Sequence, residues 1–295
     1  MRITLSGNLS YCFGVRKTLT LVEDLLARNP DRTYYMYGEI VHNELVIRDL
    51  RQKGLSIIRD LTQIGPTGSV IIPSHGAPLR VFEDLRTRGI DVIDATCPMV
   101  RLIHEKAQRL EAGGAVVVIL GDPRHDEVRG IAGHVSRALV FRRPEEVTPD
   151  ALAGVLKAGV VVQSTFIREE ALAILEAITT VVPEVVFEDT ICRPTSERQE
   201  EVRLMAGRHD CVLIVGSRRS ANTRHLYDLA AGENGCVHFV DDPEGIVGLP
   251  IAADATVFIA SGASTPMSAV ERAVELMQRR PIPPPAGEAE GKKNG

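Results

Sequence analysis

Three cysteines at the ends of apolar segments constrain this chain more than any other feature. Cys97 and Cys192 each follow an apolar segment that is typical of a short buried strand, and Cys12 follows another at 3–5. Pro98 cannot donate a hydrogen bond to a sheet, so the strand before Cys97 should stop there. Open α/β sheets place their ligands at the carboxyl ends of strands. The three cysteines are 85 and 95 residues apart, which predicts three similar units that each bring one thiolate to a shared centre.

Apolar strands alternate with amphipathic helices along the whole chain. Because this alternation is typical of parallel βαβ units, we expect an α/β fold of three similar units with mostly parallel sheets. The clearest strands lie at 70–72, 115–120, 160–162, 211–215 and 257–260, and helices are expected at about 100–112, 196–206 and 223–231, among others.

The same pattern divides the chain. We expect residues 1–12, a strand and a loop, to join the third unit. The three units should span 13–97, 98–191 and 192–280. Residues 281–295 are rich in Pro, Gly, Lys and Glu, which predicts a disordered tail.

The bulk composition excludes several classes of function. The chain has 295 residues, of which 44% are apolar and 25% charged, and its formal charge is -5. These values are ordinary for a soluble globular protein and give no reason to expect a nucleic acid or an acidic membrane as partner. No segment is long and apolar enough to cross a bilayer, and residues 1–7 lack the apolar core of a signal peptide. We therefore expect a cytoplasmic protein whose five cysteines are free, metal-bound or catalytic rather than disulfide-bonded.

Unusual polar residues collect just past the carboxyl ends of the expected strands. Serine hydroxyls, asparagine amides and backbone N–H groups at helix N-termini suit phosphate oxygens, and histidine adds positive charge when a dianion is near. If the three units pack around an approximate threefold axis, these side chains converge near the cysteines and form an anion pocket. They are His42 and His75 in the first unit, His125, Glu127, Ser164 and Thr165 in the second, and Ser220, Asn222 and Ser264 in the third.

Glu127 is the acid that stands out in these loops, because it lies two residues after His125. A carboxyl group beside a metal cluster and a phosphate has a raised pKa and can deliver protons. The alternative is that Glu127 is a solvated loop charge.

Three cysteines far apart in the sequence favour an iron–sulfur cluster. Structural zinc usually takes four ligands in paired spacing, and Cys12, Cys97 and Cys192 form no such pair. A [4Fe-4S] cluster accepts ligands from distant segments, and three cysteines would leave its fourth iron open as a Lewis acid and electron donor. The alternative is that some cysteines are buried core residues, an interpretation that fits Cys211 and Cys236. The histidines that we interpret as structural or surface residues are His104, His134, His209, His225 and His238.

Nine short motifs, taken in order, resemble one known family. They are CFGV at 12–15, GEIVHN at 38–43, SHG at 74–76, DATCP at 94–98, HDEVRG at 125–130, QST at 163–165, DTIC at 189–192, SAN at 220–222 and GASTP at 262–266. From residue 3 to about residue 280, the chain resembles the 4-hydroxy-3-methylbut-2-enyl diphosphate reductase (LytB/IspH) family of the methylerythritol phosphate isoprenoid pathway.

The resemblance implies a trefoil-like, pseudo-threefold arrangement of three α/β units around a central [4Fe-4S] cluster held by Cys12, Cys97 and Cys192. The implied reaction removes the hydroxyl of (E)-4-hydroxy-3-methylbut-2-enyl diphosphate as water, using two electrons and two protons. It yields isopentenyl diphosphate and dimethylallyl diphosphate. The implied electron donor is a ferredoxin or a flavodoxin.

The resemblance also implies roles for the pocket residues. Glu127 would supply protons, helped by the hydroxyl of Ser164 or Thr165. The implied catalytic residues are Glu127, His125, Ser164 and Thr165. The implied substrate-binding residues are His42, His75, His125, Ser164, Thr165, Ser220, Ala221, Asn222 and Ser264.

Three positions depart from the family pattern. Ala221 stands where a second serine is usual, Ser164 where a threonine is common, and Glu197 where an asparagine is common. Losing one hydrogen bond at Ala221 weakens binding by roughly 0.5–3 kcal/mol, although its backbone N–H can still contact phosphate. One alternative is therefore a paralogous cluster reductase that acts on a related allylic or aryl diphosphate. Another is a non-enzymatic iron–sulfur sensor, which would have no reason to keep Glu127 and the pocket histidines.

Overall fold

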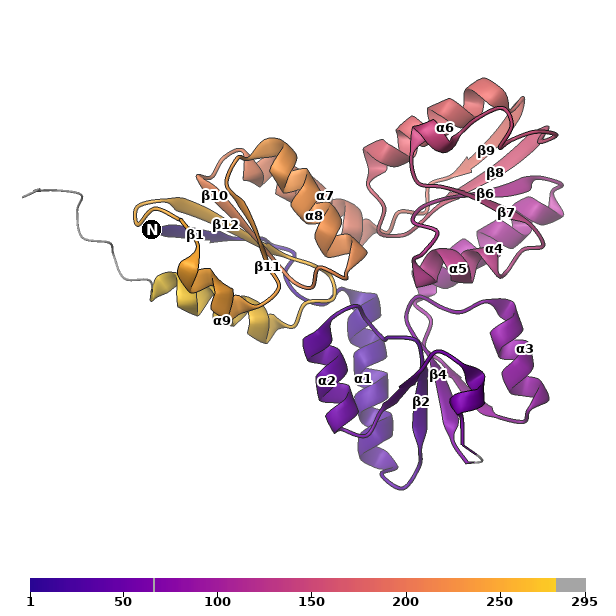
Figure 1. Cartoon of the computed structure of the whole chain (residues 1–295), viewed down its shortest axis with the longest axis horizontal. Coiled ribbons are helices and arrows are strands. Elements are labelled where there is room, and N and C mark those ends of the chain that lie inside the picture. The colour runs from indigo at the N-terminus through magenta and orange to yellow at the C-terminus, as the bar shows by residue number, and fades with distance from the viewer. Residues whose placement is uncertain (66, 280–295) are drawn as a thin grey trace, which may run out of the picture.

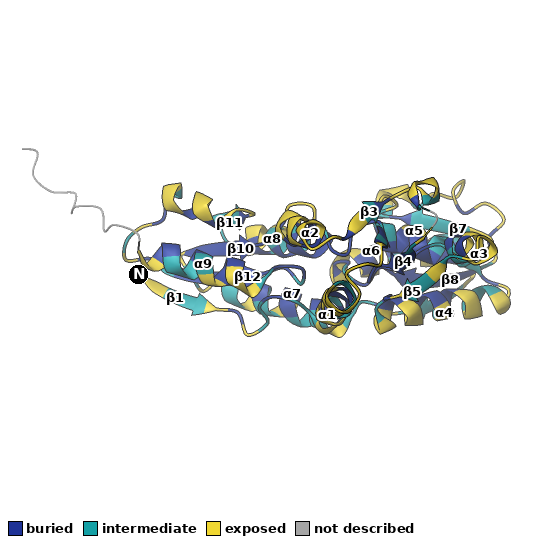
Figure 2. Ribbon diagram, turned by 90° about the horizontal axis from the view of Figure 1, so that it is seen from below, coloured by how far each residue is buried: buried dark blue, intermediate teal, exposed yellow. Residues whose placement is uncertain are grey.

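The computed structural model describes residues 1–65 and 67–279, so the tail expected at 281–295 lies outside the described residues. Within them, the chain forms three four-stranded sheets, each flanked by helices. Figure 1 shows three units arranged like the leaves of a trefoil, and the perpendicular view in Figure 2 shows that they lie in one flat layer. The α/β class with parallel sheets and the trefoil arrangement expected from the sequence are confirmed.

Each unit contains four strands and three α-helices among the described residues. The first has α1 (Phe13–Arg28), β2 (Tyr34–Tyr37), α2 (Glu44–Gln52), β3 (Ser56–Ile58), β4 (Ser69–Ile72), α3 (Leu79–Thr87) and β5 (Asp91–Asp94). The second has α4 (Pro98–Ala112), β6 (Val116–Leu120), α5 (Asp126–Ala132), β7 (Ala138–Phe141), β8 (Lys157–Val162), α6 (Arg168–Val181) and β9 (Glu184–Glu188). The third has β1 (Arg2–Leu5), α7 (Arg193–Ala206), β10 (Cys211–Val215), α8 (Ala221–Glu233), β11 (Val237–Val240), β12 (Thr256–Ser261) and α9 (Met267–Gln278). Short 3-10 helices lie at Leu61–Gln63, Pro144–Glu146 and Pro243–Gly248.

The three sheets share one strand order. They run β3-β2-β4-β5, β7-β6-β8-β9 and β11-β10-β12-β1, and every strand pair in the described residues is parallel. In the third sheet β1 takes the edge place that β5 and β9 hold in the others, and it pairs with β12 from Arg2 opposite Thr256 to Leu5 opposite Ile259. The chain therefore begins with the strand that completes its last sheet.

The apolar runs form strands because both faces of each sheet are covered. In the second unit, Val118 and Val160 pack against α6 on one face, whereas Val117 and Val161 pack against α4 and α5 on the other. Fully burying one such side chain stabilises the folded state by about 1.5–3 kcal/mol. Continuous runs of Val and Ile without polar alternation are the expected signature of such covered parallel sheets.

The structure corrects several boundaries. The segment at 121–130, taken as a loop, contains the start of α5, and β7 was not predicted at all. Helix α5 has only seven residues and includes Gly130, so its helical period was too short to recognise. The helices α4, α7 and α8 begin two or three residues earlier than expected, at Pro98, Arg193 and Ala221.

The units also bond directly to one another. These contacts surround the centre of the trefoil, where the carboxyl ends of the strands face inward. They join Leu79 N to Gly133 O (3.1 Å), Gln199 Nε2 to Phe166 O (2.9 Å), and Ser217 Oγ to Glu44 Oε2 (3.0 Å).

Candidate active site

The three strand-end cysteines occupy equivalent positions. Cys12, Cys97 and Cys192 are the N-cap residues of α1, α4 and α7. Their backbone N–H groups donate to the loops after β12, β4 and β8, at Ala263 O (3.1 Å), Ser74 O (3.0 Å) and Ser164 O (3.0 Å), respectively. Each thiol thus sits at the positive end of a helix, where thiolate and other anions are stabilised.

The cysteines and the other pocket residues enclose one central cavity of about 160 Å³. All thirteen site residues expected from the sequence line it, although they come from all three units. They are Cys12, His42, His75, Cys97, His125, Glu127, Ser164, Thr165, Cys192, Ser220, Ala221, Asn222 and Ser264. The cavity is also lined by Phe13, Val15, Ile40, Val41, Met99 and Val100.

The surroundings of the thiols are tightly packed. A Cβ atom at Gly14 would lie only 2.6 Å from Cys97 Sγ, so the first turn of α1 has room for this thiol only because residue 14 is glycine. Burial raises the pKa of Cys97, and it raises the pKa of Cys192 to about 11. Thr195 Oγ1 lies 3.0 Å from Cys192 Sγ. Thiols held in this way lose their protons when a metal binds rather than to solvent.

Arg198 is a neighbour of the thiols that the sequence did not reveal. Its guanidinium is buried and donates to Ser10 O (2.9 Å) and Pro194 O (3.0 Å). Burial lowers the pKa of Arg198, and the nearby Cys12 and Cys192 oppose that shift. A fixed positive charge here favours an anionic group held by these cysteines. The sequence did not predict this role for Arg198, because helical spacing alone does not show which face of α7 lies toward the central cavity.

Glu127 and Ser164 form a buried pair at the cavity wall. Glu127 is 3% exposed, its Oε1 accepts from Ser164 N (2.6 Å), and its Oε2 accepts from Ser164 Oγ (2.7 Å). Burial raises the pKa of Glu127 despite these two hydrogen bonds. Thr165 also lines the cavity, but its hydroxyl accepts from Gln163 Nε2 (2.9 Å). The pair at Glu127 can therefore store and release a proton inside the cavity.

Three histidines meet on another side of the cavity. His42 and His75 stack with ring centroids 5.3 Å apart, and His125 turns its edge to both at 5.5 and 6.3 Å. Burial and the neighbouring rings lower the pKa of His75, and they lower the pKa of His125 to about 3. The rings of His75 and His125 are therefore largely neutral in the ligand-free protein, and an approaching polyanion would raise the pKa values of these two rings and draw protons onto them.

The third unit contributes buried polar groups, some of which have no hydrogen-bond partner in the described residues. Both side-chain polar atoms of Asn222 and the hydroxyl of Ser264 are buried without a hydrogen-bond partner in the part of the chain that the structure describes. Ser220 caps α8 by accepting from Thr223 N (3.4 Å). A buried polar group left unpaired destabilises a protein by about 1–3 kcal/mol, so these groups are suited to a polar ligand.

An ion pair between units lies beside the histidines and was not predicted. Arg219 of the third unit donates through Nη2 to both carboxylate oxygens of Glu39 of the first unit, each at 2.7 Å, and Nη1 lies 3.2 Å from Glu44 Oε1. The hydrogen bond with His42 and the guanidinium of Arg219 lower the pKa of Glu39 from 4.5 to about 2. This ion pair therefore links the first and third units next to the cavity.

The three departures from the expected motifs fall in different places. Ala221 and Ser164 face the cavity. Glu197 does not line it and instead accepts from Arg193 Nε (2.6 Å) on the same helix. Only the first two can change how a ligand is held.

The fold and the site together define a class: three α/β units that bring one cysteine each to a shared polar cavity. The LytB protein family model matches residues 3–278. The chain belongs to this family.

Individual relatives agree with this assignment. The chain is 32% identical over 281 residues to the 4-hydroxy-3-methylbut-2-enyl diphosphate reductase of Dechloromonas aromatica, a match that covers 94% of this chain and 92% of that protein. It is 31% identical over 287 residues to the enzyme of the same name from Neorickettsia sennetsu, with 95% and 92% covered.

Two solved structures are similar. One, described as (E)-4-hydroxy-3-methyl-but-2-enyl diphosphate reductase, the terminal enzyme of the non-mevalonate pathway, has a TM-score of 0.67 at 32% identity and covers 94% of this chain and 99% of that one. The other, a reductase from Plasmodium falciparum, has a TM-score of 0.87 at 24% identity, covers 95% of this chain and 89% of that one, and supports the fold alone.

Proposed function

We propose that this chain is a 4-hydroxy-3-methylbut-2-enyl diphosphate reductase. It removes the hydroxyl of (E)-4-hydroxy-3-methylbut-2-enyl diphosphate with two electrons and two protons, and it yields water with isopentenyl diphosphate or dimethylallyl diphosphate. One observation carries the proposal: cysteines 85 and 95 residues apart cap three helices around the same cavity as the buried Glu127–Ser164 pair.

The donor set fits a [4Fe-4S] cluster. Cys12, Cys97 and Cys192 would each hold one iron, and the helix N-termini and Arg198 would balance the negative charge of the cluster. When bound, the cluster would supply the electrons and one open iron as a Lewis acid toward the substrate hydroxyl.

The polar walls would hold the diphosphate. Asn222 and Ser264 would give their unpaired groups to its oxygens, and the first two residues of α8, Ala221 and Asn222, line the same cavity. His42, His75 and His125 would contact the diphosphate, and His75 and His125 would gain positive charge as it binds, because a polyanion raises the pKa of these two rings. Ala221 would contribute through its backbone N–H alone.

Glu127 would deliver a proton to the reacting end of the substrate. Burial keeps its carboxyl group protonated at a higher pH than in water, and Ser164 Oγ lies 2.7 Å from Oε2, within reach for proton transfer. The apolar side chains Val15, Val41 and Met99 would cover the isoprenoid carbons and exclude water.

The remaining partners follow from the proposed reaction. A small one-electron protein, either a ferredoxin or a flavodoxin, would supply electrons in the cytoplasm. The structure itself adds only that no helix among the described residues is long and apolar enough to cross a membrane.

The test is an assay on protein purified without oxygen. A reduced viologen dye reports electron consumption after (E)-4-hydroxy-3-methylbut-2-enyl diphosphate is added. We expect rapid, substrate-dependent dye oxidation that is abolished in Cys97→Ser and kept in the matched variant Cys211→Ser, which lies outside the cavity. No dye oxidation by protein with full iron and sulfide would contradict this substrate. It would favour a paralogous reductase of a related allylic diphosphate, with Ala221 the first position to examine.

A further inference from the structure

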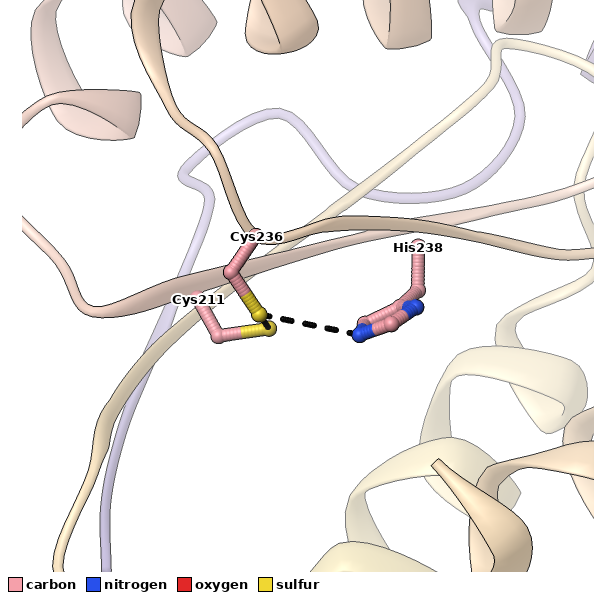
Figure 3. A group of neighbouring side chains, drawn as sticks. All are labelled: Cys211, Cys236 and His238. Carbon is pink, nitrogen blue, oxygen red and sulfur yellow. Dashed lines mark hydrogen bonds between the residues drawn. The ribbon is translucent and has the colours of Figure 1, made fainter. Parts of the chain in front are cut away.

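Two cysteines of the third unit lie side by side at the amino ends of neighbouring strands. Cys211 is the first residue of β10, and Cys236 directly precedes β11, in a register that pairs Val212 with Val237. Their Sγ atoms are 2.7 Å apart. Figure 3 shows the two sulfur atoms next to each other on one side of the ribbon. Cys211 is buried, whereas Cys236 is partly exposed.

A histidine stands next to the more exposed thiol. His238 follows Cys236 by two residues, so both side chains point to the same face of the sheet. Its Nε2 atom lies 3.6 Å from Cys236 Sγ (Figure 3). This group sits at the amino ends of β10 and β11, whereas the candidate active site lies past the carboxyl ends. The two sites therefore occupy opposite edges of the third sheet.

Backbone hydrogen bonds fix the position of the thiol pair. Val212 N donates to Cys236 O (2.8 Å), and Cys236 N donates to Asn234 Oδ1 (2.6 Å). The side-chain amide of Asn234 in turn donates to Ala206 O and His209 O, both at 2.7 Å. The two sulfurs are thus brought together by strand register and a pinned turn, so little rearrangement is needed for them to react.

The geometry favours a disulfide over a metal site. A disulfide bond is about 2.05 Å long, and neighbouring strands lie about 4.8 Å apart, a spacing that such bonds span readily. Two thiolates on one tetrahedral zinc, each bound at about 2.3 Å, would lie about 3.7 Å apart and would need a fourth ligand besides His238. We propose that Cys211 and Cys236 are a reversible dithiol–disulfide pair that hydroperoxides oxidise, with His238 activating Cys236.

The proposed step balances with hydrogen peroxide as oxidant. His238 Nε2 accepts the thiol proton of Cys236, and the thiolate attacks one peroxide oxygen. The O–O bond breaks, Cys236 becomes a sulfenic acid, and the departing hydroxide takes the proton from His238 to form water. Cys211 Sγ then attacks the sulfenic sulfur, so the S–S bond forms, the S–O bond breaks, and the oxygen leaves with the thiol proton of Cys211 as a second water. A dithiol reductant reverses the reaction.

The test uses the full chain, loaded with its cluster without oxygen and then exposed to one equivalent of hydrogen peroxide. After alkylation, trypsin places the two cysteines in separate peptides, 209–218 and 225–272, so mass spectrometry detects a link directly. We expect this linked pair to be the main cysteine cross-link and to disappear with dithiothreitol. In Cys211→Ser, dimedone should label Cys236, whereas in Cys236→Ser the labelling of Cys211 should be at least tenfold lower.

A matched pair of variants tests the histidine. We expect His238→Gln to slow dimedone labelling of Cys236, measured in the Cys211→Ser background, at least fivefold. His209→Gln should leave it unchanged, because His209 lies in the same unit but its ring contacts Thr4 and Phe258.

Two outcomes would overturn the proposal. One is the absence of the 211–236 link after peroxide treatment, with both peptides recovered as free thiols. The other is one equivalent of zinc per chain in the purified protein that is lost in Cys211→Ser and that blocks the link, which would make the group a metal site.

Discussion

The five cysteines form two groups that the fold assembles in different ways. Cys12, Cys97 and Cys192 come from three units and meet only when all three are packed together. Cys211 and Cys236 are neighbours in one sheet and need only local strand register. The first group lies at carboxyl strand ends, where helix N-termini stabilise anions, and the second lies at amino strand ends. The comparison teaches that the chemistry of a cysteine here depends on which end of a strand carries it.

The largest expected effect separates the two groups by iron content. Cys97→Ser removes one of the three thiolates proposed to hold the cluster, and Cys12 and Cys192 cannot replace it. We therefore expect the variant to be purified without iron–sulfur absorbance and without activity. Cys211→Ser should keep both. Iron and sulfide analysis of the two variants, prepared side by side without oxygen, is the measurement. Equal iron loss in both would break the comparison.

The second largest effect tests whether Glu127 supplies a proton in the central cavity. Glu127→Gln keeps the size of the side chain but removes its transferable proton, so we expect the turnover rate to fall by about 10²–10⁴-fold while the cluster spectrum is retained. A sensor without catalysis would be indifferent to this change. Normal turnover would show that the proton comes from elsewhere, and loss of the cluster would make Glu127 structural.

The third effect concerns stability and belongs to the paired cysteines. Oxidation of Cys211 and Cys236 would close a loop of about 25 residues, which should stabilise the folded state by about 3.5 kcal/mol in the loop-entropy model. Thermal unfolding of cluster-free protein, with and without prior peroxide, measures this gain. It should vanish in Cys236→Ser, and a lower unfolding temperature after oxidation would show that the bond strains the sheet.

A smaller effect is the pH dependence of the centre. The pKa values of His75 and His125 are lowered from 6.5 in the folded state, so the unfolded chain binds protons first as the pH falls. Stability present above pH 6.5 should therefore be lost below it, by about 1–2 kcal/mol per histidine near pH 5. Unfolding of wild type and His125→Asn at pH 7 and pH 5 tests this. Inorganic diphosphate should raise the free energy of unfolding of the wild type more at pH 5 than at pH 7. If wild type and His125→Asn lose the same stability between pH 7 and pH 5, His125 is not a source of this pH dependence.

The smallest effect concerns Ala221. Restoring a hydroxyl with Ala221→Ser adds one hydrogen-bond donor to a buried cavity wall, so we expect KM to fall several-fold, corresponding to about 1 kcal/mol. Steady-state kinetics with the diphosphate substrate measure it. A rise in KM would show that the cavity has no room for the hydroxyl and that Ala221 is matched to a different substrate.

Much of the site was predictable because strand ends carry a strong signal. An apolar run that stops at Cys97–Pro98 fixes where the thiol lies in a parallel sheet, and equivalent ends meet when equivalent units pack together. Glu127 shows the limit of this logic. Its place near His125 was predictable. Its burial and its hydrogen bond with Ser164 depend on helix α5, which has only seven residues and was therefore not recognised from the sequence.

Contacts between units were beyond sequence reasoning. Arg219 and Glu39 are 180 residues apart and meet only because the first and third units pack side by side. The pairing of Cys211 with Cys236 was not predicted, for a different reason. Each was interpreted as a core cysteine from its apolar surroundings. The spacing of two residues between Cys236 and His238 would have indicated that their side chains lie on the same face of the sheet.

The position of β1 has a consequence for synthesis. During translation the segment at 2–5 leaves the ribosome before every other strand of the three sheets, but its partner strand at 256–261 emerges more than 250 residues later. The first and second units can fold as they appear, whereas the strand that leads to Cys12 must wait for the end of the third. The proposed cluster can then be loaded only after β12 has been made, and ribosome-stalled chains that stop before β12 should be unable to retain iron.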